Sequence, residues 1–317
     1  MEFSTESFTD KKLSCLVIGT LGRTIDGLED HCRFFDDALE LGYTCIDTAL
    51  AYNSEQTIGE WMKSRNNREQ VYLITKGAHP SRFRTRVTPF DIEADLHDSL
   101  AYLQTDYVDL YLLHRDDESK PVSLIVDLLN RFCDEGKIRA FGGSNWTAAR
   151  IAEANAYAKA NGLRGFAASS PNFSLAEQIA EPWAPGCVTI SGPQEKEQRK
   201  FYAETQMPVF AYSGLARGLF SGRMSREQFI NRPEEINEPC RIGYCCDNNF
   251  TRLERAEELA KKHGASVPQI ALAFTMSSGL NVYPIVGAMN RQEMQNNVDA
   301  LQVKLTQDEL DYLDLIQ

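Results

Sequence analysis

Apolar stretches of strand length alternate with longer amphipathic stretches along almost the whole chain. The predicted strands cover residues 13–20, 43–49, 71–77, 106–114, 138–145, 165–172, 208–214 and 281–288. Between them, apolar residues recur at steps of three and four, which predicts helices such as 88–104, 123–137 and 148–161. Strand and helix alternate eight times without a Pro/Gly-rich linker. This pattern predicts an α/β fold, a closed (β/α)8 TIM barrel, as one domain over residues 1–317.

Two loops are longer than this repeat requires. Residues 215–250, after the seventh predicted strand, form a polar insertion with Pro and Asn that exceeds an ordinary strand–helix connection. We expect this insertion to be a lid or side wall over the barrel mouth. A smaller loop after the sixth strand carries Trp183 between two prolines. A doubly wound sheet is the alternative architecture, but "GTLGRT" after the first strand lacks the GxGxxG turn of a dinucleotide-binding fold.

Composition narrows the class of protein. The chain has 317 residues, 43% of them hydrophobic, so it can bury a large core. Its net charge of −12 argues against nucleic acid or an anionic membrane as a partner. The N-terminal "MEFSTESFTDKK" is acidic and polar where a signal peptide is basic and then apolar, so we expect a cytoplasmic protein. The eight cysteines form no CxxC pair, which favours reduced thiols and no metal site.

Ionisable residues stand where several predicted strands end. Asp47 ends the second strand, Lys76 the third and His114 the fourth. Tyr52 follows Asp47 in the next loop, just before a helix that Ser54 is predicted to cap. Taken alone, His114 is more simply explained as a structural histidine and Lys76 as a solvated lysine. Since polar residues at the C-terminal ends of barrel strands converge on one face, the group as a whole favours a functional site.

The chemistry of this group follows from its charges. A nearby ammonium favours the phenolate of a tyrosine, so Lys76 is expected to lower the pKa of Tyr52. A lysine packed into a barrel mouth tends to lose its proton, and Asp47 is placed to keep Lys76 charged. His114 is then expected to bind and orient a substrate oxygen. The group suits the protonation of a developing alkoxide, with Tyr52 as the general acid.

These residues resemble the aldo-keto reductase family. Asp47, Tyr52, Lys76 and His114 match the family's catalytic tetrad in order and in context ("DTA…Y", "ITK", "LLH"). The resemblance covers essentially the whole chain. It implies a TIM barrel, hydride transfer from a nicotinamide cofactor and a small carbonyl substrate.

The resemblance also implies a set of cofactor-binding residues. "GGSNW" (142–146) is similar to the family's nicotinamide-carboxamide site, "FAYSGLARGLFSG" (210–222) to its seventh-strand segment, and "PIVGAMNRQEMQNNVDAL" (284–301) to the segment at the adenosine end. The implied residues are Gly19, Thr20, Ser144, Asn145, Ser170, Tyr212, Ser213, Leu215, Arg217, Gly287, Arg291 and Asn297. The chain departs from the family at Ser170, where Gln is usual, and at Glu293, where Arg is frequent. The N-terminal hairpin of the family is expected to be shortened or absent.

The cofactor and the substrate are predicted from fewer residues. Arg291 and Arg217 offer cations for a 2′-phosphate, so NADP(H) is the expected cofactor, and NAD(H) is the alternative if Arg291 points to solvent and Glu293 binds the ribose. Trp183, as a substrate-binding residue, and Phe83 at the mouth suit aromatic aldehydes or sugars. Two other functions stay open: a Schiff-base aldolase using Lys76, and a non-catalytic nucleotide-sensing subunit.

Overall fold

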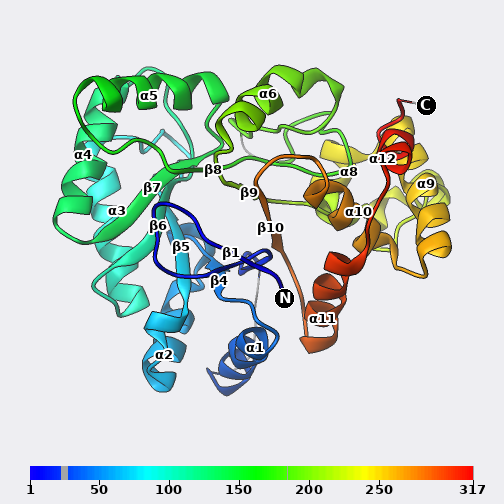
Figure 1. Cartoon of the computed structure of the whole chain (residues 1–317), viewed down its shortest axis with the longest axis horizontal. Helices are drawn as coiled ribbons and strands as arrows, with labels where there is room; N and C mark the ends of the chain where they lie inside the picture. Colours follow the sequence, from blue (N-terminus) through cyan, green and yellow to red (C-terminus); the bar gives the residue numbers. More distant parts are fainter. Residues whose placement is uncertain (23–27, 184, 317) are drawn as a thin grey trace. The chain divides into compact units, whose positions relative to one another are not determined.

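The chain divides into two compact units in the computed structural model, which describes residues 1–22, 28–183 and 185–316 (Figure 1). The first unit comprises Met1–Ser170 and Gly287–Met294. The second comprises Pro171–Val286 and the chain from Gln295 onward. Beside this division, the single domain over residues 1–317 stays a prediction.

Parallel strands form the centre of the first unit. Its strands are β1 (Phe3–Ser4), β2 (Leu13–Ser14), β3 (Val17–Gly19), β4 (Cys45–Asp47), β5 (Tyr72–Gly77), β6 (Val108–Leu113), β7 (Ile138–Ser144) and β8 (Ala168–Ser170). From β3 to β8, each strand pairs in parallel with the next. β1 and β2 form a separate antiparallel pair of two residues each, so the N-terminal hairpin is present but short. The predicted strand 13–20 therefore divides into β2 and β3.

The second unit supplies the last two strands. β9 (Val209–Ala211) and β10 (Val282–Val286) pair in parallel. In the described chain the strands follow the order β10-β3-β4-β5-β6-β7-β8-β9 of a closed barrel. This order confirms the predicted (β/α)8 class, and each predicted strand segment contains one strand of the barrel.

Helices follow most of the strands. In the first unit they are α1 (Leu28–Glu40), α2 (Glu55–Arg65), α3 (Pro89–Leu103), α4 (Val122–Asp134) and α5 (Ala148–Ala160). In the second they are α6 (Lys196–Thr205), α7 (Arg226–Asn231), α8 (Glu238–Tyr244), α9 (Asp247–His263), α10 (Val267–Met276) and α12 (Gln307–Leu313). α11 (Arg291–Asp299) begins in the first unit and ends in the second. Within the described ranges, no helix is long and apolar enough to cross a bilayer.

Local sequence explains where α3 begins and how it packs. The Thr88 side chain accepts a hydrogen bond from the Asp91 N–H, and Pro89 occupies the first helical position. Against α3 lies Gly59 of α2, where a Cβ atom would stand 2.4 Å from the Tyr102 carbonyl oxygen. Only glycine allows this close approach of the two helices. Figure 1 shows α3, α4 and α5 flanking the strands β5 to β7.

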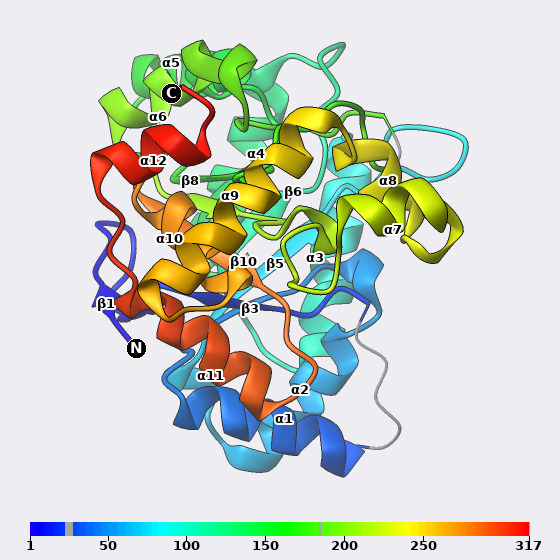
Figure 2. The same cartoon turned by 90° about the vertical axis from the view of Figure 1, so that its right-hand side faces the viewer.

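Two contacts join distant parts of the first unit. Lys11 Nζ lies 2.9 Å from Asp109 Oδ1 and donates to the Val71 carbonyl at 2.8 Å. Tyr43 Oη donates to the Met294 carbonyl at 2.9 Å. Arg291, in the first turn of α11, contacts Asp37 of α1, so the two helices lie side by side (Figure 2). The segment 287–294 is thus built into the first unit.

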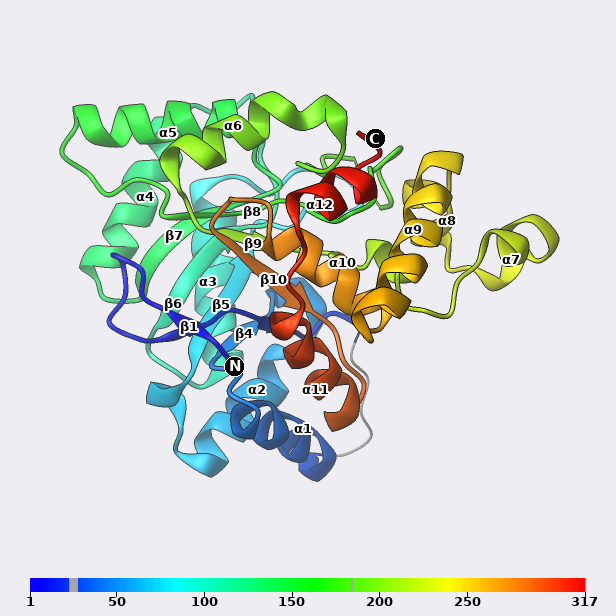
Figure 3. The same ribbon diagram turned by 45° about the vertical axis from the view of Figure 1, so that its right-hand side comes forward.

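The insertion at residues 215–250 is largely helical. It contains α7, α8 and the start of α9. Ile236, Cys240 and Tyr244 are buried in one apolar cluster with Phe250 and Leu253 of α9. Figure 3 shows α9, α10 and α12 grouped within the second unit. The insertion therefore has an apolar anchor of its own, and its role as a lid stays a prediction.

Candidate active site

The structure brings the four predicted catalytic residues together in the first unit. Asp47 ends β4, Lys76 lies near the end of β5, and His114 directly follows β6; these three strands are parallel neighbours. Tyr52 ends a short 3-10 helix, Leu50–Tyr52. Lys76 Nζ lies 2.5 Å from Asp47 Oδ1 and 4.9 Å from the centroid of the Tyr52 ring. The Tyr52 and His114 ring centroids are 5.5 Å apart.

Lys76 and Asp47 form a buried ion pair. Their side chains are 3% and 5% exposed, and Lys76 Nζ also donates to the Thr48 carbonyl at 2.9 Å. Burial acts to lower the pKa of Lys76, but Asp47 and Tyr52 together outweigh it, so this pKa is raised. Burial raises the pKa of Asp47, and Lys76 opposes that shift. Lys76 is therefore held as an ammonium.

The pKa of Tyr52 differs from the sequence-based expectation. Burial is its largest influence and raises this pKa, while Lys76 acts in the predicted, lowering direction. Because burial outweighs Lys76, the predicted net lowering is wrong. The phenol of Tyr52 therefore keeps its proton at neutral pH.

His114 is a neutral imidazole in this setting. Burial, followed by the positive charge of Lys76 and the proximity of His79 and Arg115, lowers its pKa well below the ordinary range. Its Nδ1 is buried and has no hydrogen-bond partner among the described residues. The ring of His79 stands perpendicular to that of His114, with the centroids 4.7 Å apart. Sequence reasoning missed His79, although "KGAHP" places it three residues after Lys76, just beyond the same strand.

Ser144, Asn145 and Ser170 form a polar cradle at the ends of β7 and β8. Ser144 Oγ donates to the Ser170 carbonyl at 3.1 Å, and Asn145 Nδ2 donates to the His114 carbonyl at 3.1 Å. Ser170 Oγ is buried without a hydrogen-bond partner in the part of the chain that the structure describes. Since buried hydroxyls are normally satisfied, this one is open to a hydrogen bond from a polar group of a ligand. The amide and hydroxyls of this cradle fit the carboxamide of nicotinamide.

Thr20 and Ser54 connect the first strands. Thr20 follows Gly19, the last residue of β3, and its Oγ1 donates to the Asp47 carbonyl at 3.0 Å. Ser54 stands at the N-cap position of α2 as predicted, but its side chain makes no capping hydrogen bond. Its hydroxyl lies 2.9 Å from Thr20 Oγ1 instead. The predicted capping bond of Ser54 is therefore wrong.

The second unit groups the predicted residues that follow β9. Ser213 and Arg217 have positive φ angles of 55° and 56°. The Arg217 guanidinium lies 5.2 Å from the centroid of the Trp183 ring, which lies 6.0 Å from that of Tyr212. Arg217 Nε is buried and lacks a hydrogen-bond partner within the described chain. Positive φ angles beside an arginine with one unsatisfied N–H are typical of a ligand-binding loop and are compatible with a phosphate.

The remaining predicted residues make none of the contacts described above. Leu215 is half-buried just before the 3-10 helix Ala216–Gly218. Gly287 follows β10 and is exposed, whereas Asn297 in α11 is buried. Phe83 lies in the loop after β5 and is 88% exposed. Their predicted roles stay predictions.

Arg291 lies against carboxylates of α1. Its Nη1 is 2.5 Å from Asp37 Oδ1 and 2.7 Å from Glu40 Oε2, and its side chain is 46% exposed. The nearby Glu293 accepts a hydrogen bond from the Met289 N–H at 2.9 Å. Arg291 is therefore paired with two carboxylates of α1, and the carboxylate of Glu293 is bonded to the backbone of Met289.

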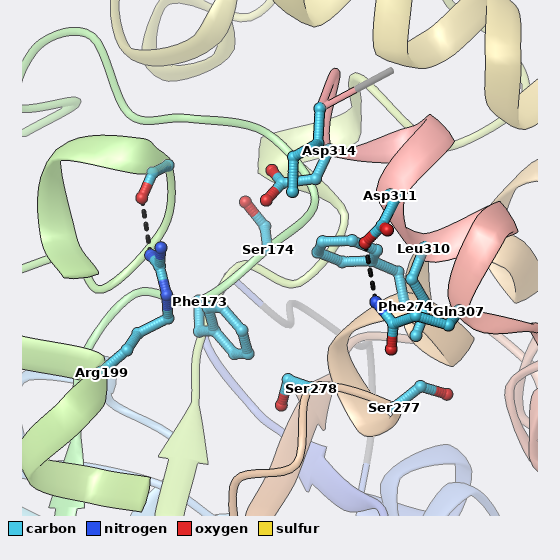
Figure 4. Close-up of a pocket in the computed structure, with 12 residues that line it drawn as sticks. Phe173, Ser174, Arg199, Phe274, Ser277, Ser278, Gln307, Leu310, Asp311 and Asp314 are labelled. Atoms are coloured by element: carbon cyan, nitrogen blue, oxygen red, sulfur yellow. Dashed lines mark hydrogen bonds between the residues drawn. The ribbon is translucent and has the colours of Figure 1, made fainter.

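A cavity of about 210 Å³ lies within the second unit (Figure 4). Its lining comes from α6, α10, α12 and the loops after β8: Phe173, Ser174, Gly192, Arg199, Phe274, Ser277, Ser278, Gln307, Leu310, Asp311, Asp314 and Ile316. Arg199 donates to the carbonyls of Ile190 and Gly192, each at 2.6 Å, and Gln307 donates to Asp311 at 2.7 Å. Among the described residues, this lining includes none of those predicted at the site.

The barrel and the ionisable group at the ends of β4, β5 and β6 define a (β/α)8 protein with an enzyme-like site. The model of the aldo/keto reductase family matches residues 17–317, and the chain belongs to this family.

Relatives and a solved structure agree with this assignment. The chain is 26% identical over 302 residues to a probable aryl-alcohol dehydrogenase of Saccharomyces cerevisiae, covering 91% of this chain and 88% of the relative. It is 28% identical over 320 residues to probable aldo-keto reductase 1 of Glycine max, covering 98% and 86%. The crystal structure of a thermostable aldo-keto reductase in complex with the inhibitor epalrestat superimposes with a TM-score of 0.74 at 23% identity, over 100% of both chains. This last likeness concerns the fold.

Proposed function

We propose that this protein reduces the carbonyl group of a small aldehyde or ketone to an alcohol, with a nicotinamide dinucleotide as cofactor and Tyr52 as the general acid. The observation that carries the proposal is the buried Lys76–Asp47 ion pair, 2.5 Å long, beside the Tyr52 ring. Membership of the aldo/keto reductase family supports carbonyl reduction in general.

The cofactor supplies a hydride to the carbonyl carbon when it is bound. In this proposal Ser144, Asn145 and the unsatisfied hydroxyl of Ser170 hold its carboxamide. Arg217, whose Nε is also unsatisfied in the described chain, holds a phosphate, and Tyr212 offers an aromatic face.

Tyr52 donates the proton that completes the reduction. Its raised pKa keeps the phenol protonated until negative charge develops on the carbonyl oxygen. Lys76, held charged by Asp47, then stabilises the phenolate that remains. His114 carries its proton on Nε2, because an Nδ1–H would be a buried donor without a partner. It therefore donates a hydrogen bond to the carbonyl oxygen and fixes its orientation.

The state of Lys76 argues against a Schiff-base aldolase. A nucleophilic lysine must be neutral to attack a carbonyl. The short contact with Asp47 and the raised pKa of Lys76 favour the ammonium instead.

The orientation of Arg291 bears on the choice of cofactor. By resemblance, the segment 284–301 binds the adenosine end, and a 2′-phosphate there needs a free cation. Arg291 is engaged by Asp37 and Glu40, and Glu293 lies close by. A phosphate dianion would enter a locally negative site. We therefore propose NADH rather than the NADPH that the sequence favoured.

An aryl aldehyde is the substrate class that we propose to test first. Trp183 and Tyr212 form an aromatic pair in the second unit. One relative is named a probable aryl-alcohol dehydrogenase. Sugars are the substrates with which the aryl aldehydes should be compared.

Replacing Tyr52 by Phe tests this function. Nucleotide affinity, measured by fluorescence titration, should persist while the reduction rate falls by about 10²-fold or more, the usual scale of general acid catalysis. Tyr102→Phe, at an exposed position on α3, is the control and should reduce carbonyls at the wild-type rate.

A Tyr52→Phe variant with wild-type turnover would contradict the role of the phenol. If no carbonyl oxidises bound NADH or NADPH, and nucleotide instead changes association with a partner protein, the nucleotide-sensing function replaces this one.

A further inference from the structure

Ser54, the N-cap of α2, and Glu55, its first residue, contact residues in or next to β3, β4 and β5. Ser54 Oγ lies 2.9 Å from Thr48 Oγ1, in addition to its contact with Thr20. The next residue, Glu55, accepts a hydrogen bond at 2.5 Å from Thr75 Oγ1 through its Oε1. All of these side chains are buried.

These contacts reach the immediate neighbours of the ion pair. Thr75 precedes Lys76 on β5, and successive residues of a strand point to opposite faces. Lys76 therefore faces the site while Thr75 faces the helix layer, where Glu55 meets it. Thr48 follows Asp47, and its carbonyl accepts a hydrogen bond from Lys76. The start of α2 is thus tied to both strands of the Lys76–Asp47 pair.

The backbone next to Tyr52 leaves helical geometry before α2 begins. Asn53, between Tyr52 and Ser54, caps the 3-10 helix with a φ of 57°, in the left-handed region that Asn adopts more readily than most residues. Ser54 also gives up the capping bond that its position would allow. The Ser54 hydroxyl is thus committed to Thr20 and Thr48, outside its own helix.

We propose that Glu55 is a positioning residue for the general acid: its buried hydrogen bond with Thr75 fixes the Tyr52 turn against the strand that carries Lys76. This inference rests on the proposed carbonyl reduction. Glu55 acts through the turn that carries Tyr52, by way of its hydrogen bond with Thr75.

Three variants separate position from charge. Thr75→Val keeps the shape of the side chain and removes the donor, and Glu55→Gln keeps an acceptor oxygen and removes the charge. Glu60→Gln changes another carboxylate of α2, which accepts a hydrogen bond from Gln56, and is the matched control.

Thr75→Val should lower kcat about tenfold, a fraction of the general acid contribution, with KM and nucleotide affinity within about twofold. Glu55→Gln and Glu60→Gln should both stay within about twofold of wild type. Thr75→Val should also shift the NMR titration of Tyr52, followed with 13C-labelled tyrosine and assigned with Tyr52→Phe. Melting temperature is recorded for every variant.

A failure of the positioning role can be told apart from a failure of the proposed carbonyl reduction. If Thr75→Val has a lower melting temperature but keeps the kcat and the Tyr52 titration of wild type, the hydrogen bond is merely structural and the inference fails. If Glu55→Gln loses as much as Thr75→Val, charge rather than position matters, and the inference also fails. If wild type reduces no carbonyl while the Tyr52 titration still responds to Thr75→Val, the proposed function fails and the positioning role stands.

Discussion

Two ion pairs in the first unit have the same nitrogen–oxygen distance but differ in how deeply they are buried. Lys76 and Asp47 are 2.5 Å apart with side chains 3% and 5% exposed. Arg291 and Asp37 are also 2.5 Å apart, but their side chains are 46% and 26% exposed. Distance alone does not distinguish the two pairs, and burial does.

The difference determines how freely each cation can change partners. Separating a buried pair leaves a charge without water or a counterion, so Lys76 and Asp47 stay together. An exposed pair is screened by salt and exchanges contacts with solvent at little cost, so Arg291 remains responsive to its environment. In the proposed function, the buried pair therefore holds the charge beside Tyr52 constant, whereas the exposed cluster affects only the choice between NADH and NADPH.

Breaking the buried pair should have the largest effect. Lys76→Met leaves Asp47 buried and unpaired, so the free energy of unfolding should fall by about 3–5 kcal/mol. Carbonyl reduction should slow, and the limb of the pH–rate profile governed by Tyr52 should move to higher pH, because the phenol loses the charge that lowers its pKa. Denaturant titration and pH–rate measurements test both effects. Asp47→Asn should act in the same direction but less, and an unchanged profile in Lys76→Met would show that Lys76 does not tune Tyr52.

Burial should also make stability depend on pH through His114. The pKa of His114 in the folded chain lies well below its ordinary value of about 6.5, so below about pH 6.5 the unfolded chain binds a proton that the folded chain does not. Stability should therefore fall with decreasing pH, by up to about 1.4 kcal/mol per pH unit for this group. Between about pH 5 and 7, the free energy of unfolding should depend less steeply on pH in His114→Gln than in wild type, as measured by denaturant titration at each pH. Equal slopes in His114→Gln and wild type would contradict a neutral buried imidazole.

Changes at the exposed cluster should have the smallest effect. Arg291→Ala should leave the melting temperature and NADH affinity essentially unchanged, because its ion pairs are open to solvent. Asp37→Asn combined with Glu40→Gln should free Arg291 and strengthen NADPH binding several-fold, an effect that diminishes at high salt. Fluorescence titration of both nucleotides measures this. Much tighter binding of NADPH than NADH by wild type would show that Arg291 leaves its carboxylates for the phosphate.

The barrel was predictable because its signal is repeated and local. Each strand from β3 to β10 carries its own short apolar run, and α3, α4 and α5 each carry the helical period over several turns. The same repeat placed Asp47, Lys76 and His114 at neighbouring strand ends. Their convergence follows from parallel pairing alone and needs no knowledge of side-chain packing.

Other features depend on depth and on partners far along the chain. The pKa of Tyr52 is dominated by burial, which a sequence pattern does not measure. Ser54 meets Thr20, 34 residues away, instead of capping its helix. Arg291 meets Asp37, 254 residues away, and nothing local to α11 indicates this contact.

The contact of Tyr43 with Met294 has a consequence for how the chain folds during synthesis. The two residues are 251 positions apart, and the segment that carries Met294 belongs to the first compact unit. On the ribosome, residues 1–170 therefore emerge long before the piece that completes their unit. Contacts of such high sequence separation form late and slow folding. We therefore expect the N-terminal part of the nascent chain to stay incompletely folded until residues 287–294 have been translated.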